Sequence, residues 1–473
     1  MAGKEATKPA FKVIIAGGSI AGLALAHCLY HAGIDFIVLE KRHEIGLQEG
    51  ASVGIMPNGG RILDQLGLYS GLEDYFHPLE VAYTSYPDGF TFISQYPKLL
   101  TQRFGYPLAF LDRQVLLQHL YSSLKCPENV YTNKQVTRVE QSCSYVRVYT
   151  KDGECYTGNL LVGADGVHSR VRSEMWRLDS SSCRGMGSES DYRGMEMEYA
   201  CVFGISSANS KLQAGQQINC YRDGWSILSV VGKHGRTYWF LFLKLDKKYQ
   251  YQTAPRLSSE DATIHCEKIA DEPFYHDVKF GDLWDRREVF NMVPLEEYAL
   301  TQWHHGNIVC IGDSMHKIAP HTGQGANCAI EDAAALTNRL RRFLQGDGAR
   351  LRSSDELNYL LQEFTTSRIE RLSVIHFSAR LVMRLHAREG LLFRLAGRYY
   401  LPYAGDIPAD KASAGIADAP TLDFIPLPDR TGSGWIDFKR STRSARPRLV
   451  LGFTLLISLL VAVPRIRGWF LLV

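Results

Sequence analysis

The sequence has none of the signals that mark a secreted, metal-binding or nucleic-acid-binding protein. Its 473 residues carry a formal net charge of only +3, which is too small to favour nucleic acid as a partner. The ten cysteines show no C-x-x-C or other metal-ligand spacing, so we expect buried thiols in a reducing compartment and no metal. The first ten residues are polar and lack the apolar stretch of a secretory signal. No internal repeat is visible, and 45% hydrophobic residues suffice for a large folded body.

One stretch, Phe11–Glu40, has the order of a nucleotide-binding βαβ unit. The apolar run Val13–Ala16 predicts a buried parallel strand, and helical and strand patterns follow it. Gly17 and Gly18 lie in the tight turn between strand and helix, and Gly22 lets the helix approach the strand closely. The backbone amides at the start of the helix would then face a pyrophosphate.

Two positions refine this interpretation. Glu40 ends the second strand, where its carboxylate is expected to accept hydrogen bonds from ribose hydroxyls, which argues against a 2′-phosphate. Ser19 stands where the G-x-G-x-x-G pattern has its second glycine. Because serine is small, the backbone can still approach the phosphates. The alternative is an α/β unit with a glycine turn and no ligand.

Two later stretches indicate which nucleotide binds to this unit. Leu160–Arg172 is a strand followed by D-G-x-x-S-x-x-R, and Asn307–Asp332 is a strand followed by G-D-x-x-H-x-x-x-P-x-x-G-x-G. With the glycine turn, they resemble the three motifs of the single-component (class A) FAD-dependent monooxygenases of aromatic-hydroxylase type. The resemblance implies FAD as cofactor, with NAD(P)H and O₂ as co-substrates. No second complete G-x-G-x-x-G occurs, so no separate reductant domain is expected.

The third motif carries several residues that the resemblance assigns to FAD. Asp313 follows an apolar strand and is expected to bond a ribityl hydroxyl. The turn at Gly325 leads into a helix expected to start near Ala326, whose amides would face the flavin pyrimidine ring. The positive end of that helix would stabilise an anionic reduced flavin. His316 is expected to be a hydrogen-bonded structural imidazole rather than an acid or base.

Three further positions match the family pattern. Arg113 is expected to reach the FAD phosphates or ribose, the alternative being a surface charge at a helix start. Gly54 lies on a strand whose backbone would contact the isoalloxazine side of the cofactor. Asp165 is expected to touch both FAD and the nicotinamide donor. The alternative is an ordinary turn, with Ser169 capping the next helix and Arg172 on its surface.

A run of β-branched and aromatic segments follows the second motif and predicts an antiparallel sheet. The resemblance implies that this sheet is the floor of the substrate pocket. Tyr221 is the catalytic candidate there, although an aromatic residue on a strand is more often part of a core. The expected strands are Met197–Ile205, Gln217–Tyr221, Trp225–Val231 and Tyr238–Leu245.

The predicted fold class is therefore α/β, with a Rossmann-like FAD-binding domain into which an antiparallel β-sheet substrate domain is inserted. A helical extension and a C-terminal hydrophobic anchor complete it. The Tyr/Phe/Pro-rich stretch 76–106 interrupts the first FAD segment. The expected boundaries are 1–179 and 291–345 for the FAD domain, 180–290 for the sheet, 346–405 for the helices, 406–448 for a polar and basic linker, and 449–473 for the anchor.

The last part of the chain predicts attachment to a membrane. Leu449–Val463 is fifteen uncharged, almost wholly apolar residues, about 22 Å as a helix and shorter than a bilayer core of about 30 Å. It would either span with the help of flanking arginines or insert as a shallow anchor; a buried core helix is the alternative. The basic flank favours an enzyme body in the cytosol, with the anchor in the endoplasmic reticulum.

Within the family, the GGSIAG, ASVGI and GQGAN segments and the hydrophobic end are similar to fungal enzymes that epoxidise prenyl chains of meroterpenoids and indole diterpenes. The resemblance implies a lipophilic prenylated substrate, oxygenated with NAD(P)H and O₂. Two alternatives stay open: a hydroxylase of a soluble aromatic substrate, and a non-oxygenating FAD reductase or cyclase of a prenyl lipid. A flavin halogenase is disfavoured because no W-x-W-x-I-P pattern occurs.

Overall fold

The computed structural model describes residues 11–48, 52–179, 195–345, 354–430 and 432–439. The expected anchor, 449–473, lies outside these ranges. Within them, no helix is both long and apolar enough to cross a bilayer. The anchor therefore stays a prediction. The described chain has the α/β fold class that was predicted, as its sheets and helices show.

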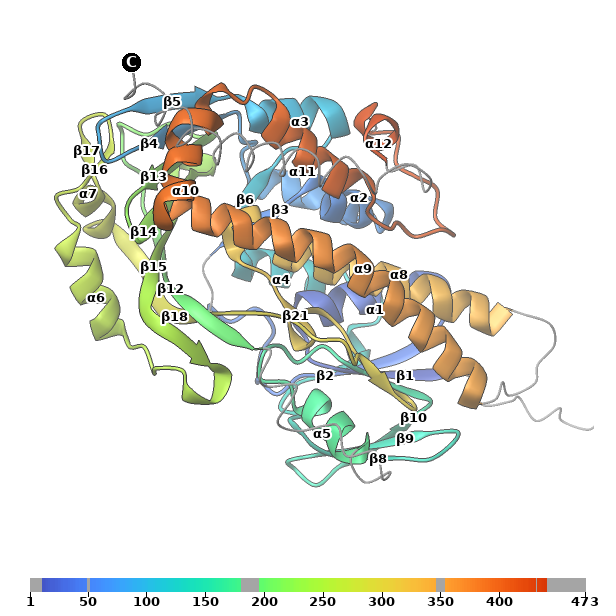
Figure 1. Ribbon diagram of the computed structural model, residues 1–473. Coiled ribbons are helices and arrows are strands. Elements are labelled where there is room, and N and C mark those ends of the chain that lie inside the picture. The colour runs from blue at the N-terminus through green and yellow to red at the C-terminus, as the bar shows by residue number, and fades with distance from the viewer. Residues whose placement is uncertain (1–10, 49–51, 180–194, 346–353, 431, 440–473) are drawn as a thin grey trace, which may run out of the picture.

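A mostly parallel sheet forms the centre of the expected FAD-binding domain (Figure 1). Its described strands have the order β19-β20-β11-β1-β2-β7, and every pair is parallel except β19 with β20. Val13 on the central strand lies opposite Phe36 and Leu160. Continuous apolar runs suit such a sheet because helices cover both faces. The strands are β1 (Lys12–Ala16), β2 (Asp35–Leu39), β7 (Val130–Tyr131), β11 (Leu160–Gly163), β19 (His304–His305) and β20 (Ile308–Cys310).

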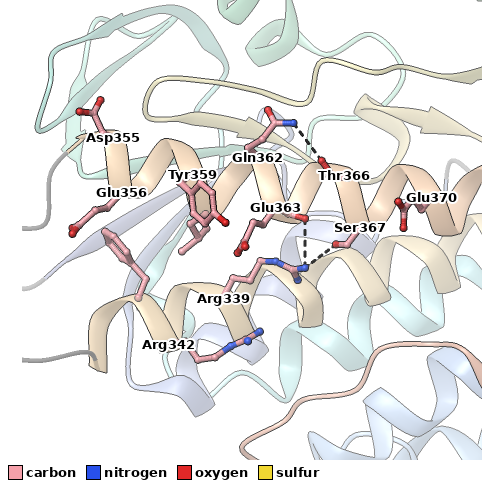
Figure 2. Close-up of a pocket in the computed structure, with 12 residues that line it drawn as sticks. Arg339, Arg342, Asp355, Glu356, Tyr359, Gln362, Glu363, Thr366, Ser367 and Glu370 are labelled. Carbon is pink, nitrogen blue, oxygen red and sulfur yellow. Dashed lines mark hydrogen bonds between the residues drawn. The ribbon is translucent and has the colours of Figure 1, made fainter. Parts of the chain in front are cut away.

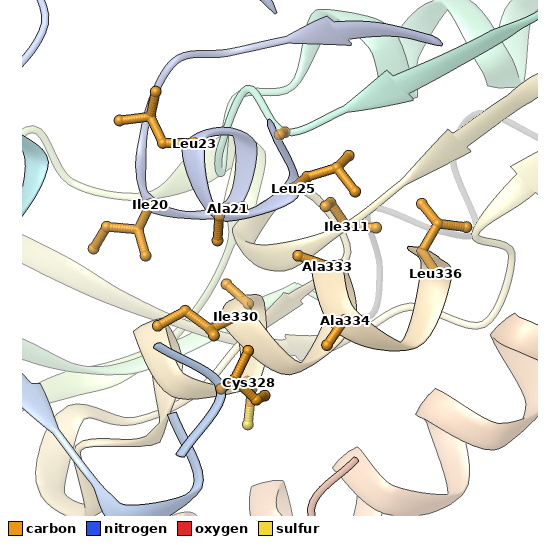
Figure 3. Close-up of a cluster of buried hydrophobic side chains, with 14 of the residues drawn as sticks. Ile20, Ala21, Leu23, Leu25, Ile311, Cys328, Ile330, Ala333, Ala334 and Leu336 are labelled. Carbon is orange, nitrogen blue, oxygen red and sulfur yellow. The ribbon is translucent and has the colours of Figure 1, made fainter. Parts of the chain in front are cut away.

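Two helices pack tightly against each other over this sheet, α1 (Ile20–Ala32) and α8 (Gln324–Gln345). Figure 3 shows Ala21 of α1 directed toward α8, within a cluster of larger buried side chains. A small residue at this position lets the two helix backbones approach closely. Helix α8 begins two residues before the predicted start.

The second sheet has eight described strands in the order β21-β18-β12-β15-β14-β13-β4-β5. Neighbours are antiparallel except β13 and β4, which pair in parallel. β4 and β5 come from the stretch 76–106, where no strand was predicted, because only pairing with the distant β13 places them in the sheet. The strands are β4 (Val81–Ser85), β5 (Thr91–Ser94), β12 (Glu196–Ser206), β13 (Gln216–Tyr221), β14 (Trp225–Val231), β15 (Thr237–Gln250), β18 (Arg287–Ala299) and β21 (His316–Lys317).

Smaller elements surround the two sheets. A two-stranded ribbon, β3 (Ser52–Ile55) with β6 (Ala109–Asp112), leads into the helices next to it. The others are α2 (Pro57–Gln65), α3 (Tyr96–Phe104), α4 (Arg113–Ser122), β8 (Val136–Gln141), β9 (Val146–Thr150), β10 (Cys155–Gly158), α5 (Arg170–Asp179), α6 (Ser259–Lys268), β16 (Pro273–Tyr275), β17 (Val278–Lys279) and α7 (Phe280–Trp284).

The long helix α9 (Ser354–His386) joins the two halves of the molecule. It runs beside α8 and ends near the eight-stranded sheet (Figure 1). Three short helices follow it: α10 (Gly390–Leu395), α11 (Ile407–Ala417) and α12 (Gly434–Asp437).

The described part of the expected linker 406–448 is packed rather than free. The side chain of Gln65 on α2 donates to the carbonyl of Leu422 and accepts from its amide. Trp435 is 6% exposed and donates its indole N–H to the carbonyl of Phe104. The many Gly, Pro and Asp residues suggested a linker, but a few buried apolar side chains anchor this stretch to α2 and α3.

Candidate active site

The glycine turn after β1 packs so closely against neighbouring backbone atoms that Gly17 and Gly22 leave no room for a side chain. Gly17 has φ +109°, and a Cβ there would lie 2.4 Å from the carbonyl oxygen of Ala164. A Cβ on Gly22 would lie 1.9 Å from the carbonyl oxygen of Gly17. Both positions therefore need glycine for the reason that the sequence predicted, close approach of helix, strand and turn.

Glu40 lies beside this turn, at the carboxyl end of β2. Its carboxylate is 5% exposed and accepts from the amide of Gly18 at 2.6 Å and from that of Arg42 at 2.9 Å. At the start of α1, no side chain caps the helix and its first turn holds no acidic residue. An acceptor for hydroxyls and an open helix N-terminus thus lie together, as a ribose and a pyrophosphate require.

Arg113, the first residue of α4, reaches across to the same turn. Its guanidinium donates to the hydroxyl of Ser19 at 2.7 Å. The serine that departs from the glycine pattern is therefore a hydrogen-bond acceptor for the arginine. This contact places a cation at the N-terminus of α1, where phosphates are expected.

Asp165 follows β11 and lies next to Gly17. Its carboxylate accepts from the Ser169 hydroxyl at 2.5 Å and from the amides of Arg170 and Val171 at 2.7 and 3.1 Å. Burial raises the pKa of Asp165, and these donors partly offset the rise. The side chain of Asp165 thus caps α5, and its backbone lies against Gly17 of the glycine turn.

Arg172 joins the second motif to the third, so the alternative that placed it on the helix surface is wrong. It is 1% exposed and donates to the carbonyls of Ser314 at 2.5 Å and Val167 at 2.8 Å. The Ser314 hydroxyl in turn donates to the carbonyl of Gly163. These bonds fix the loops after β11 and β20 relative to each other.

Asp313 lies at the end of β20, where ligands bind in open α/β sheets. Its carboxylate pairs with Lys317 at 2.5 Å and its side chain is 35% exposed. Burial alone would raise the pKa of Asp313, but Lys317, His316 and Arg113 outweigh it and hold that pKa below its ordinary value. The carboxylate is therefore ionised and open to a hydroxyl donor.

Gly325 lies in the first turn of α8, where a Cβ would meet no atom of the described residues within 4 Å. This position at the helix start therefore leaves room that a flavin ring would require. The strand with Gly54 lies next to it: the Asn327 amide donates to the carbonyls of Gly54 at 2.9 Å and Gly323 at 2.7 Å. Its oxygen accepts from the amide of Met56. Asn327 thus links Gly54 to Gly323, in the turn that precedes Gly325 and Ala326.

Sequence reasoning gave Asn327 no role, although it lies inside the GQGAN segment. A buried asparagine directly after a glycine turn was the available signal, since such a side chain must satisfy its donors and acceptor.

A buried ionic cluster beneath α8 was also missed. Arg368 on α9 donates to Asp332 at 2.6 Å and to Glu331 at 3.0 Å, and all three are at most 2% exposed. Asp332 also accepts from the amide of Gly312 and bonds the ring of His316 at 2.7 Å. His316 thus has the geometry of the hydrogen-bonded structural imidazole that was expected. The signal was a pair of acids at the end of the third motif, whose arginine partners lie more than thirty residues away.

Burial would raise the pKa of both acids. Arg371 and Arg368 outweigh this effect and hold the pKa of Glu331 below its ordinary value. Arg368 and His316 do the same for Asp332. The cluster therefore fixes α8 to α9 through charged groups rather than through apolar packing alone.

The glycine turn, Glu40, Asp313 and the starts of α1 and α8 are together called the cradle below. Tyr221 belongs to another part of the molecule, the end of β13. It is 4% exposed, and its hydroxyl is 2.7 Å from Nε2 of His386, the last residue of α9. The ring of His321, from the turn before Gly323, lies 5.1 Å from the ring of His386 and stacks on Phe242 at 3.8 Å. Tyr221 is thus connected to the third motif through two histidines that the sequence did not single out.

The residues around the cradle fit FAD. The turn that side chains would fill, the open starts of α1 and α8, and the acceptors Glu40 and Asp313 match a dinucleotide that carries phosphates, ribose and ribityl hydroxyls. When bound, FAD supplies hydride acceptance and reaction with O₂.

A hollow of about 870 Å³ lies elsewhere, between the second half of α8 and the first half of α9. Figure 2 shows Arg339 and Arg342 facing Glu363 and Tyr359 across it. None of the predicted site residues lines it, and Arg339 is about 20 Å along α8 from Gly325. We assign it no part in the site.

Fold and site together define a class A flavoprotein monooxygenase, an oxidoreductase that uses FAD. The family model described as "FAD binding domain" matches residues 10–354, and the chain belongs to this family. It is 54% identical over 445 residues to the FAD-dependent monooxygenase cdmI of Talaromyces verruculosus, covering 93% of this chain and 92% of that protein. It is 47% identical to the FAD-dependent monooxygenase paxM of Penicillium paxilli, covering 92% of each.

Solved structures agree on the fold. Klebsiella pneumoniae HpxO, complexed with FAD and uric acid, has a TM-score of 0.71 at 22% identity and covers 87% of this chain and 97% of its own. A salicylate hydroxylase substrate complex has a TM-score of 0.63 at 18% identity, covering 88% of this chain and 100% of its own.

Proposed function

We propose that this enzyme uses NAD(P)H and O₂ to epoxidise the prenyl chain of a lipophilic meroterpenoid or indole-diterpene intermediate in secondary metabolism. The observation that carries the proposal is the uncharged face of the eight-stranded sheet. Direct partners on neighbouring strands share a face, so Tyr221, Ser226, Phe242 and Cys201 form one row. Asn219, Leu228, Phe240 and Phe203 form the next.

This face is directed toward the FAD cradle. Phe242 stacks on His321, which directly precedes the turn into α8. The neighbouring row contains Tyr199 and Lys244. Among the described residues of these three rows, Lys244 is the single cation, and it pairs with Glu389 at 2.6 Å. An apolar alkene would be held there by aromatic rings, while a carboxylate would find no free countercharge.

The chain's own residues would act by binding and orientation. The amides at the start of α1 bind the pyrophosphate, and the start of α8 places positive potential beside the flavin ring. The phenylalanine rows orient the alkene and exclude water from it. Relatives named FAD-dependent monooxygenases, at 47–54% identity, support the oxygenase assignment.

The test is the product formed from a farnesylated or geranylgeranylated aromatic compound with NADPH and ¹⁸O₂. Epoxidation adds one labelled oxygen atom and removes one alkene from the prenyl chain. Label on the aromatic ring instead would support the hydroxylase alternative. Product without label would support a reductase or cyclase.

The apolar run Leu449–Val463 supports the further proposal that the enzyme is anchored in a membrane, the endoplasmic reticulum, with its body in the cytosol. A lipophilic substrate partitions into the same membrane.

A further inference from the structure

We propose that Tyr221, His386 and His321 form a subsite that binds an uncharged oxygen substituent, a hydroxyl or a carbonyl, on the ring system of the substrate. The inference rests on the proposed function for the type of substrate, and it adds which functional group that substrate carries. It also gives the two histidines a role in binding.

The three side chains come from three separate elements and meet at one place. The Tyr221 hydroxyl is 2.7 Å from Nε2 of His386, and the two rings stack at 4.2 Å between centroids with 27° between planes. The ring of His321 lies edge-on to His386 at 5.1 Å. The stack on Tyr221 and the edge-on contact with His321 fix the orientation of the His386 ring.

Several polar atoms of this group are buried without a hydrogen-bond partner among the residues that the structure describes. They are Nδ1 of His386, both ring nitrogens of His321, and the hydroxyls of Thr322 and Ser226. His386 itself is only 7% exposed. Buried polar atoms in native proteins are almost always paired, so a cluster of unpaired ones on the expected substrate face calls for a partner that the described part of the chain does not provide.

The neighbouring polar residues on the same face are already satisfied by one another. Tyr96 donates to Gln217 at 2.6 Å, Gln217 to Asn219 at 3.1 Å, and Asn219 to Thr84 at 3.3 Å. Among the described residues, the unpaired polar atoms on this face are therefore concentrated at the two histidines and at Thr322 and Ser226, beside Tyr221.

The charge state of the group selects a neutral ligand. Burial lowers the pKa of His386 to about 3, and burial together with His386 lowers the pKa of His321. Burial also raises the pKa of Tyr221. All three are uncharged near pH 7, and one proton shared between the tyrosine oxygen and Nε2 leaves the pair with both a donor and an acceptor. A hydroxyl or carbonyl matches this pair, whereas a carboxylate would be buried without a counterion.

The test uses three probes that differ in one group: 2-farnesylphenol, farnesylbenzene and 2-farnesylbenzoate. Each is titrated against the oxidised, FAD-loaded enzyme, with the change in flavin absorbance as the readout. In the wild type we expect the phenol to bind about 3- to 10-fold more tightly than farnesylbenzene, the range of one neutral hydrogen bond. The benzoate should bind most weakly.

The variants Tyr221→Phe and His386→Phe should each abolish the advantage of the phenol while leaving the affinity for farnesylbenzene unchanged. The double variant should lose no more than either single one, because the two residues act as one unit. His386→Gln should retain part of the advantage. Tyr359→Phe, which removes an exposed hydroxyl from the same helix α9, is the matched control and should behave as wild type.

Equal losses for the phenol and for farnesylbenzene in the variants would assign a purely structural role and overturn the proposal. So would tighter binding of the benzoate, or no binding of the phenol. The proposed epoxidation is judged separately, because the titrations need neither NADPH nor turnover: probes that bind but gain no oxygen would contradict the reaction and leave the subsite intact.

Discussion

At the scale of single residues, the cofactor cradle depends on a few side chains whose charge matters more than their size. Glu40 holds a buried carboxylate between the Gly18 amide and the place expected for a ribose. Asp313 stays ionised because Lys317 and its neighbours outweigh burial. Each can therefore be tested by a change that removes or reverses its charge and hydrogen bonding.

Glu40→Lys should weaken FAD binding, because an acceptor for hydroxyls and for the Gly18 amide becomes a donor. The expected loss is roughly 1.5–3 kcal/mol, the value of a hydrogen bond to a charged group. FAD titration by fluorescence quenching measures it. Glu40→Gln keeps one acceptor oxygen and should lose less; undiminished flavin content in the lysine variant would contradict the role of Glu40.

Asp313→Ala should likewise lower FAD affinity by about 1.5–3 kcal/mol if the carboxylate bonds the ribityl chain. Lys317→Ala removes the partner without removing the acceptor, so it should cost clearly less. Normal FAD titration and normal turnover in Asp313→Ala would reject this assignment.

At the scale of elements, the important contacts join segments that are far apart in the chain. The βαβ unit, the strands β12 to β15 and the helices α8 and α9 were predictable because their periodicity and turns are local. The roles of Asn327, Arg172 and His386 were not, because each has a partner 142 to 273 residues away. The pairing of β4 with β13 was missed for the same reason. Motif spacing thus indicated the cradle, but not the polar contacts that hold it together.

Asn327→Ala should lower both stability and FAD affinity, because two backbone carbonyls and one amide lose their partner. We expect a loss of about 1–3 kcal/mol in the free energy of unfolding. Asn338→Ala is a matched control on the same helix: it loses bonds to Thr421 and Asp423 near the chain's end. It should lower the melting temperature without changing FAD affinity. Equal FAD affinities in the two variants would contradict the role of Asn327 in holding the strand with Gly54 next to the cofactor.

Arg368→Gln should destabilise the fold by about 3–5 kcal/mol at pH 7, because Asp332 loses its buried guanidinium partner. The folded pKa values of Glu331 and Asp332 lie below their ordinary values. The stabilisation is thus fully present above about pH 4.5 and is lost as the pH falls through the folded pKa values. The difference in melting temperature between wild type and variant should therefore stay constant from pH 7 down to about pH 4.5 and shrink below it. A difference that also stays constant below about pH 4.5 would exclude this electrostatic origin.

At the scale of the whole molecule, the sequence indicated the main parts but misjudged how the chain leaves the folded body. The described residues from α11 onward return to α2 and α3, where Trp435 and Leu422 are buried. The Gly and Pro content of this stretch concealed its anchoring residues. The apolar run Leu449–Val463 therefore follows a packed segment, which allows a truncation to separate membrane attachment from folding.

Truncation before Leu449 should leave the folded body and its FAD intact while moving the protein into the soluble fraction. The full chain should sediment with microsomes, because the apolar run buries its surface in lipid at about 25 cal/mol per Å². Turnover of a membrane-partitioned substrate should fall more than NADPH oxidation does, since only access to the substrate is lost. Truncation before Ile407 is the control: it removes α11 and α12, exposes the surfaces that Trp435 and Leu422 cover, and should lower the melting temperature. A full-length chain that stays soluble without detergent, or loss of flavin on truncation before Leu449, would show that the apolar run is packed into the fold instead of a membrane.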